Sequence, residues 1–180
     1  MHAIRRTILA LGILAFPLAA ANAASVIVKG VHLCCGACVQ GVAKALKDVK
    51  GVSQLACDRD GKTVAFTAAD DKAAKAGIAA LAKGGYGGVA IHGGKPLAFP
   101  ATGVKKGLKA NSVTFVGIHL CCGGCVNGAK EAVEQLDGVT AIDVDRKDRT
   151  ITVRGKDISV AAASAALFKG GFYGKLKTGK

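Results

Sequence analysis

The sequence has few of the residues that nucleic-acid-binding surfaces use. Its 180 residues include no tryptophan and only two tyrosines, and basic residues outnumber acidic ones by 25 to 12, a formal net charge of +13. Nucleic-acid binding usually shows a concentrated basic patch, and single strands are often held by stacking on aromatic side chains. Here lysine and arginine are spread along the chain, so we expect no nucleic-acid partner and only weak attraction to anionic surfaces.

The sequence also lacks the residue patterns of common enzymes. No acidic pair stands near a histidine, and no glycine-rich phosphate loop precedes a Lys-Ser or Lys-Thr pair. We therefore expect a protein that is not an enzyme.

Long apolar runs are missing too, except at the N-terminus. Two arginines precede an apolar run from Ile8 to Ala21, and a small-x-small cleavage signal ends at Ala23. The run is short for a span of roughly 20 residues and contains Pro17, which argues against the alternative of an uncleaved anchor helix. We expect residues 1–23 to be a cleaved signal peptide, the protein to be periplasmic or secreted, and the mature chain not to span a membrane.

Six of the seven cysteines lie in a string that occurs twice. Residues 32–38 read HLCCGAC and residues 119–125 read HLCCGGC. A duplicated string predicts a duplicated structural unit. Seven cysteines cannot all pair within one monomer, and the spacing within each string is too tight for a disulfide framework between domains. The strings therefore indicate either soft-metal sites or redox sites.

Each half of the chain predicts the same order of elements. Apolar residues at helical spacing follow the first cysteine string (Val39, Val42, Leu46 and Val49), and Gly51 is expected to end that helix, as Gly138 ends its counterpart. The predicted strands and second helices cover residues 25–31, 55–57, 63–67, 71–83 and 89–91 in the first half, and 112–118, 142–144, 150–153, 159–169 and 175–177 in the second.

This order, βαββαβ, predicts an α+β protein made of two tandem ferredoxin-like domains. A segment rich in proline, glycine and lysine, with Pro96 and Pro100, has the composition of a linker. The expected organisation is a signal peptide (1–23), domain 1 (24–92), a linker (93–111) and domain 2 (112–180).

The Cys-x-x-Cys pairs stand where a loop enters a helix. There the backbone N–H groups and the helix dipole stabilise a thiolate, which is the form that binds metals. Two thiolates at this spacing suit thiophilic ions such as Cu(I), Hg(II) or Zn(II). The predicted ligands are Cys35 and Cys38 in the first unit, and Cys122 and Cys125 in the second.

Both units resemble the heavy-metal-associated domain family, which includes small copper chaperones, modules of P-type ATPases and a periplasmic mercury-binding protein. The family motif G-M-x-C-x-x-C aligns with residues 32–38 and 119–125. The resemblance implies the βαββαβ fold, an exposed two-thiolate site in each unit, transfer of the ion by ligand exchange, and a metal-transporting membrane protein as a candidate partner. It also implies that Tyr86 and Phe172 lie in a loop that approaches the metal, where we expect them to shield it.

Six residues depart from the family motif or fill its variable position, and two of them, Leu33 and Leu120, replace its methionine with another apolar residue. Cys34 and Cys121 precede the two pairs, and His32 and His119 replace the family's glycine. The two cysteines are either additional ligands or packed thiols, and each histidine either completes a Cys₃His site or orients the loop. The seventh cysteine, Cys57, is expected to be a small core residue.

Three functions remain open on the sequence alone. The favoured one is an exported binding protein that buffers, scavenges or transfers a thiophilic metal ion, with Cu(I) or Hg(II) preferred and one ion bound independently by each unit. The first alternative is a periplasmic thiol-disulfide oxidoreductase, because Cys-x-x-Cys before a helix also occurs in redox proteins. The second is an interaction module of the cell envelope whose cysteines form disulfides.

Overall fold

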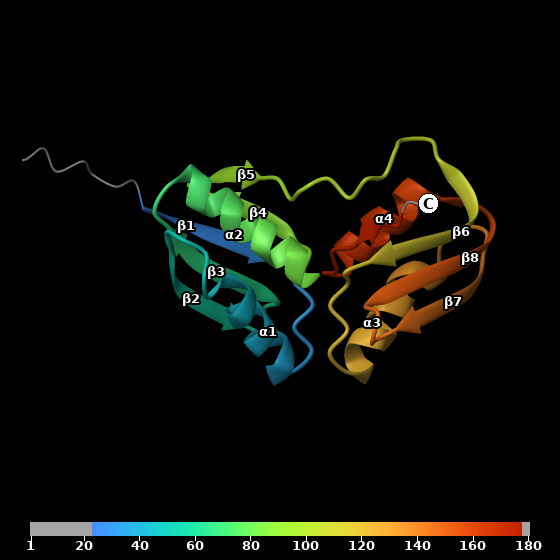
Figure 1. Cartoon of the computed structure of the whole chain (residues 1–180), viewed down its shortest axis with the longest axis horizontal. Helices are drawn as coiled ribbons and strands as arrows, with labels where there is room; N and C mark the ends of the chain where they lie inside the picture. Colours follow the sequence, from blue (N-terminus) through green and yellow to red (C-terminus); the bar gives the residue numbers. More distant parts are fainter. Residues whose placement is uncertain (1–22, 178–180) are drawn as a thin grey trace, which may run out of the picture.

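The computed structural model describes residues 23–177, which form two similar domains side by side (Figure 1). Nearly all of the predicted signal peptide, residues 1–22, lies outside the described residues. Each domain is an antiparallel sheet covered by two helices, as expected for tandem ferredoxin-like units. Among the described residues, no helix is long and apolar enough to cross a membrane.

The N-terminal domain follows the predicted order and adds one strand. Its elements are β1 (Ala24–Lys29), α1 (Gly36–Leu46), β2 (Val52–Asp58), β3 (Thr63–Ala68), α2 (Asp71–Gly84), β4 (Val89–His92) and β5 (Lys95–Leu97). The sheet order is β2-β3-β1-β4-β5, so the first strand lies in the middle, between β3 and β4. The cysteine loop leaves the end of this central strand.

The C-terminal domain repeats this arrangement with four strands. Its elements are β6 (Lys109–Val116), α3 (Gly123–Glu134), β7 (Val139–Asp145), β8 (Thr150–Ser159), α4 (Val160–Lys169) and β9 (Lys175–Leu176). The sheet order, β7-β8-β6-β9, matches the first four strands of the other sheet. The α+β class and the βαββαβ order are therefore confirmed.

The first helix of each domain, α1 or α3, ends earlier than the sequence predicts. The first ends at Leu46 and the third at Glu134, each several residues before the expected glycine. Gly51 and Gly138 instead have φ of +81° and +79° in the turns that enter the next strands. The sequence signal for a glycine was correct, but it marks a tight turn with positive φ and not the helix end.

The predicted linker is largely ordered. Its start forms β5, which pairs with β4, and its last residues belong to β6. Between them, the Phe99 ring packs edge-on against Phe168 of α4, with 5.1 Å between centroids, and the Tyr173 hydroxyl donates to the carbonyls of Pro100 and Ala101 at 3.2 Å. The segment is therefore held to the N-terminal domain by strand pairing and to the C-terminal domain by the contacts of Phe99 and Tyr173.

The two cores are apolar. Alternate residues of the central strands, such as Val26 and Val28 in β1, point toward the helices and are fully buried, and so are Phe66 and Phe115. The described residues include no buried polar or charged side chain in this core.

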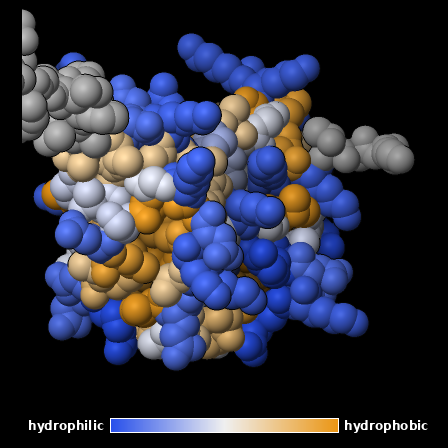
Figure 2. Space-filling view, turned by 60° about the vertical axis from the view of Figure 1, so that its left-hand side comes forward, coloured by the Kyte–Doolittle hydropathy of each residue, from blue (hydrophilic) through white to orange (hydrophobic). Residues whose placement is uncertain are grey.

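The opposite face of the N-terminal sheet carries a few exposed apolar side chains. Ile27 and Ile91 are cross-strand partners there, and Val89 is 66% exposed. In Figure 2, which brings the N-terminal domain forward, hydrophilic side chains surround a smaller hydrophobic area.

Candidate metal site

Each cysteine string places its Cys-x-x-Cys pair at the start of a helix, as predicted. Cys35 and Cys122 are the N-cap residues of α1 and α3, with extended backbone conformations, and the second cysteine of each pair lies in the first helical turn. Each helix therefore directs its free N–H groups and its positive dipole end toward a pair of sulfurs. This environment favours thiolates.

The structure brings the two cysteine loops together. The loop before α1 and the loop before α3 run side by side in the middle of the molecule (Figure 1), and sulfurs of the two domains are in contact. We call these six sulfurs the thiol cluster: it comprises Cys34, Cys35, Cys38, Cys121, Cys122 and Cys125. Cys35 and Cys38 are the N-terminal pair, Cys122 and Cys125 the C-terminal pair, and Cys34 and Cys121 the extra cysteines.

Sulfurs in the cluster are as close between domains as within them. Contacting Sγ atoms of different domains are 3.4–3.8 Å apart, and those of one domain 3.5–3.8 Å. All of these cysteines are free thiols. The sequence predicted two separate sites, whereas the structure forms one continuous group of sulfurs. That difference was not readable from the sequence, because the domain packing decides it.

The cluster is buried on one side and open on the other. Cys38 and Cys125 are buried and Cys34 is exposed. The remaining three sulfurs, of Cys35, Cys121 and Cys122, are half-buried. A cavity of about 280 Å³ beside Cys121 is lined also by Arg146 and Arg149. An ion or a partner's ligand can thus reach the cluster from its edge.

Thiols within the cluster differ in acidity. A backbone hydrogen bond from Cys125 and a hydrogen bond from Cys34 lower the pKa of Cys122 to about 6. Partial desolvation, together with hydrogen bonds to neighbouring thiols, raises the pKa of Cys34 and of Cys121. Closely packed sulfurs cannot all carry charge at once, so the metal-free cluster holds protons that a bound cation would displace.

Each histidine of the strings stacks on the aromatic residue of the opposite domain. His32 lies on Phe172 with 4.4 Å between ring centroids, and His119 lies on Tyr86 at 4.3 Å. Residues 86 and 172 also form an isolated antiparallel bridge. The aromatic residues therefore cover the loops of the partner domain.

The setting lowers the pKa of both histidines. Burial, with a contribution from Arg149, lowers the pKa of His119 to about 4, and burial followed by the charge of Lys62 lowers the pKa of His32. A ring nitrogen of His119 lies within 4.8 Å of the sulfurs of Cys38, Cys121 and Cys125. This group has the composition of a Cys₃His site.

The other histidine, His32, has two cluster sulfurs near its ring in place of three. A nitrogen of His32 lies within 4.8 Å of the sulfurs of Cys34 and Cys125. Its Nε2 is buried and has no hydrogen-bond partner among the described residues. The His119 Nε2, in contrast, lies 3.3 Å from the Tyr86 hydroxyl.

Sequence reasoning missed three arginines that support the loops. Arg59 donates to the Cys34 carbonyl at 3.2 Å and Arg146 to the Cys121 carbonyl at 2.7 Å. Arg149 donates to the carbonyls of Gly84 and Gly117, both at 2.8 Å, and so joins the two domains. The Asp-Arg dipeptides that contain Arg59 and Arg146 recur in matching hairpin turns, which is a signal that the sequence offered.

Cys57 lies outside the thiol cluster. It is half-buried on β2, where it pairs with the fully buried Val64 and packs against the core. The structure therefore agrees in part with the predicted core position. Burial raises the pKa of this thiol.

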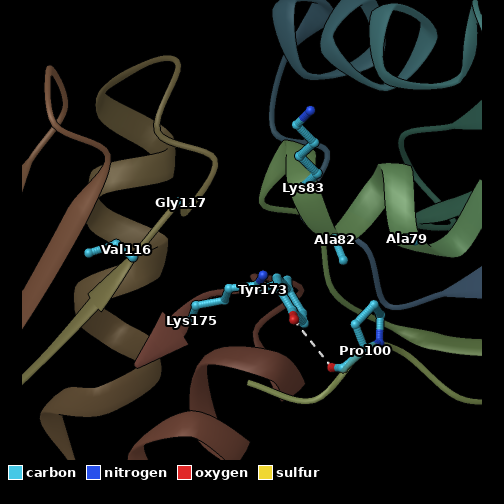
Figure 3. A pocket seen from close by; sticks show the side chains of 8 residues that line it. All are labelled: Ala79, Ala82, Lys83, Pro100, Val116, Gly117, Tyr173 and Lys175. Carbon is cyan, nitrogen blue, oxygen red and sulfur yellow. Dashed lines mark hydrogen bonds between the residues drawn. The ribbon is translucent and has the colours of Figure 1, made fainter. Parts of the chain in front are cut away.

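A separate cavity of about 430 Å³ lies between α2, the linker and the C-terminal domain (Figure 3). Its lining residues are Ala79, Ala82, Lys83, Pro100, Val116, Gly117, Tyr173 and Lys175. They include no thiol and no imidazole, so this cavity is not part of the candidate metal site.

Comparison with protein families identifies both domains. The model of the heavy-metal-associated domain (HMA) matches residues 25–87 and 114–169. The chain belongs to the HMA family. HMA domains bind heavy metals, and the two matches cover the two cysteine strings described above.

Individual proteins add only distant likenesses. No curated protein matches this chain. The apo HMA domain of the copper chaperone for superoxide dismutase is 17% identical over 47% of this chain and 88% of its own, with a TM-score of 0.35. The N-terminal soluble domains of Bacillus subtilis CopA are 20% identical over 87% of this chain and 95% of theirs, with a TM-score of 0.34.

Proposed function

We propose that this protein is an exported binding protein for a thiophilic metal ion, with Cu(I) or Hg(II) preferred over Zn(II), and that it buffers, scavenges or transfers the ion without catalysing a reaction. The observation that carries this proposal is the thiol cluster. Six free thiols lie within 3.4–3.8 Å of their neighbours at the N-termini of two helices. Packed sulfurs of this kind suit soft d¹⁰ ions, which accept low coordination numbers and thiolate ligands.

The ligands in this proposal are the N-terminal and C-terminal pairs. Backbone hydrogen bonds at the helix starts favour the thiolates of Cys38 and Cys122, whose pKa values are lowered, while burial raises the pKa of Cys125. The open edge of the cluster gives access for ligand exchange. A metal-transporting membrane protein is the partner that best fits such exchange. The N-terminal sequence supports export to the periplasm or beyond.

Metal titration tests the proposal directly. The reduced mature chain, kept anaerobic with a non-thiol reductant, is titrated with Cu(I) against a competing chelator. We expect tight binding that disappears when both pairs are changed to serine. The matched control is Cys57→Ser, which removes a thiol outside the cluster and should leave the titration unchanged. Binding that survives loss of both pairs would refute the assigned ligands.

The low pKa of one cluster thiol keeps thiol-disulfide exchange as a second candidate. Cys122, with a pKa of about 6 and a half-buried position, is suited to attack a disulfide. In that case the protein would reduce or isomerise a small disulfide faster than glutathione, and Cys122→Ser would abolish the effect. Turnover at the rate of free glutathione would exclude this function and leave metal binding.

A further inference from the structure

The extra cysteine of the N-terminal domain lies against the C-terminal pair. Its sulfur, on Cys34, is 3.4 Å from that of Cys122 and 3.6 Å from that of Cys125, and the two sulfurs of the pair are 3.8 Å apart. Gly124 leaves room for this approach, since a Cβ there would stand 3.2 Å from the Cys34 sulfur. The three sulfurs form a triangle to which both domains contribute.

The arrangement is reciprocal. The sulfur of Cys121 lies 3.8 Å from that of Cys35 and 3.5 Å from that of Cys38, and the N-terminal pair itself is 3.8 Å apart. Each extra cysteine also contacts one sulfur of its own pair, Cys34 with Cys38 at 3.6 Å and Cys121 with Cys125 at 3.5 Å. Only the extra cysteine of the other domain contacts both sulfurs of a pair. Nothing in the sequence distinguishes this from a third ligand in the same loop.

The spacing of the sulfurs fits three-coordination better than two-coordination. With metal–sulfur bonds of about 2.3 Å, a linear ion needs sulfurs roughly 4.6 Å apart and a trigonal ion roughly 4.0 Å apart. The pairs, at 3.8 Å, would open by about 0.2 Å for a trigonal ion and by about 0.8 Å for a linear one. The edges to the extra cysteines, now 3.4–3.8 Å, would open by about 0.2–0.6 Å for a trigonal ion. No edge of either triangle therefore changes as much as the roughly 0.8 Å that a linear site requires of a pair, which favours the trigonal site.

Backbone contacts between the domains hold the two loops in this register. The His32 amide donates to the Gly171 carbonyl at 3.3 Å, and the His119 amide donates to the Gly85 carbonyl at 3.4 Å. The Tyr173 amide also donates to the Gly85 carbonyl, at 2.9 Å. The proximity of the sulfurs is therefore built into the domain interface.

We propose that the thiol cluster binds its ions across the domain interface, with Cys34 as third ligand to the ion of the C-terminal pair and Cys121 as third ligand to the ion of the N-terminal pair. This inference rests on the proposed function, because it names the ligands of the same metal site. Each ion then ties the two domains together, and its release requires either loss of one sulfur or separation of the domains. Such coupling suits retention of an ion more than rapid transfer.

The decisive experiment removes one pair and then asks which extra cysteine the remaining site uses. The full mature chain carrying Cys35→Ser and Cys38→Ser is loaded with one equivalent of Cu(I), and X-ray absorption counts the sulfurs around the ion. We expect three. Adding Cys34→Ser should lower the count to two, whereas adding Cys121→Ser, the matched control, should leave it at three.

The opposite result would overturn the proposal. If Cys121→Ser lowers the count and Cys34→Ser does not, the third ligand comes from the same loop. A count of two in every variant means that the extra cysteines are not ligands, and the proposed function still stands. Failure of the wild-type chain to bind Cu(I) at all would instead refute the proposed function itself.

A second experiment separates the domains without touching a cysteine. An added Cβ at Gly85 would overlap the backbone near His119, and one at Gly171 would overlap the backbone near His32. The double variant Gly85→Ala/Gly171→Ala should therefore reduce the sulfur count in the Cu(I)-loaded chain from three to two. Retention of three sulfurs, with the domains shown to be apart by small-angle scattering, would overturn the proposal.

A matched variant controls for backbone strain. Gly30 and Gly117 also have positive φ, +76° and +80°, but a Cβ at either position would meet nothing within 4 Å. Gly30→Ala/Gly117→Ala should carry a similar conformational penalty and keep three sulfurs. Loss of the third sulfur in this control as well would mean that the ligation depends on loop strain and not on domain contact.

Discussion

Tyr86 of the N-terminal domain and Phe172 of the C-terminal domain occupy matching places after α2 and α4, and they differ by one hydroxyl group. The Tyr86 hydroxyl donates to the Cys38 carbonyl at 2.9 Å and lies 3.3 Å from the His119 Nε2. Phe172 offers no such group, and the His32 Nε2 beside it has no hydrogen-bond partner within residues 23–177. The cysteines are arranged almost symmetrically about the interface, but the hydrogen bonds to the neighbouring histidines differ between the two sides.

Lys62 and Arg149 extend this contrast. They occupy matching turns, with φ of +49° and +54°, and their carbonyls accept hydrogen bonds from Val31 and Ile118, which begin the two cysteine loops. Only Arg149 reaches across the interface, to the last carbonyls of α2. Since cations stabilise helix C-termini, α2 receives a cap from the other domain. These two differences between the repeats thus lie at their contact.

The two cores also carry their large aromatic residue on different strands. Phe66 on β3 fills the N-terminal core and Phe115 on β6 fills the C-terminal core, and each is fully buried. Replacing Phe115 with alanine should cost about 3–5 kcal/mol of stability, because it leaves a large cavity. Denaturant unfolding measures this cost.

The same variant shows whether the domains unfold together. If the interface couples them, signals from both domains should move to lower denaturant concentration in one transition. Two transitions, with the N-terminal one unchanged, would mean that each domain is stable without the other's contact.

The two cores also differ at Gly77, where the N-terminal domain combines a small helix residue with a large strand residue. A Cβ at this position of α2 would lie 2.6 Å from the ring of Phe66, whereas the C-terminal domain has Ala163 at the matching helix position and Val153 at the matching strand position. Gly77→Ala should therefore destabilise the N-terminal domain by about 1–3 kcal/mol through overpacking. The double variant Gly77→Ala/Phe66→Val, which copies the other domain, should recover part of this loss in thermal unfolding. A double variant less stable than Gly77→Ala alone would contradict the compensation.

Arg149→Lys makes the C-terminal turn resemble its N-terminal counterpart. Lysine keeps the charge but cannot reach several carbonyls with a planar fork of donors. We expect a loss of about 1.5 kcal/mol, since hydrogen bonds from charged groups are stronger than neutral ones. Lys62→Met, which removes a charge at the matching turn but none of the described hydrogen bonds across the interface, serves as the control for thermal unfolding. Equal losses in the two variants would show that Arg149 contributes no more than Lys62.

Much of this structure could be predicted from the sequence. Periodicity and the repeat gave the βαββαβ order, and the position of the Cys-x-x-Cys pairs at helix starts followed from the loop between Val31 and Val39. The helix ends were wrong because Gly51 and Gly138 mark turns. The joint cluster of Cys34 with the C-terminal pair could not be predicted, because no pattern within one repeat encodes how the two repeats pack.

The smallest effect is expected for Phe172→Tyr, which gives both domains a tyrosine at this position. Phe172→Tyr would place a hydroxyl near the His32 Nε2, as Tyr86 does for His119. A buried donor or acceptor gains about 1 kcal/mol from a new hydrogen bond, so the variant should unfold at a higher temperature if His32 can shift slightly to admit the oxygen. Tyr86→Phe is the matched reverse change and should lower stability by a similar amount, because it leaves the His119 Nε2 without its partner. If Phe172→Tyr is instead less stable than wild type while Tyr86→Phe loses as expected, the space around His32 is too tight for an oxygen. The asymmetry between the domains would then be fixed by packing and not by the missing hydroxyl.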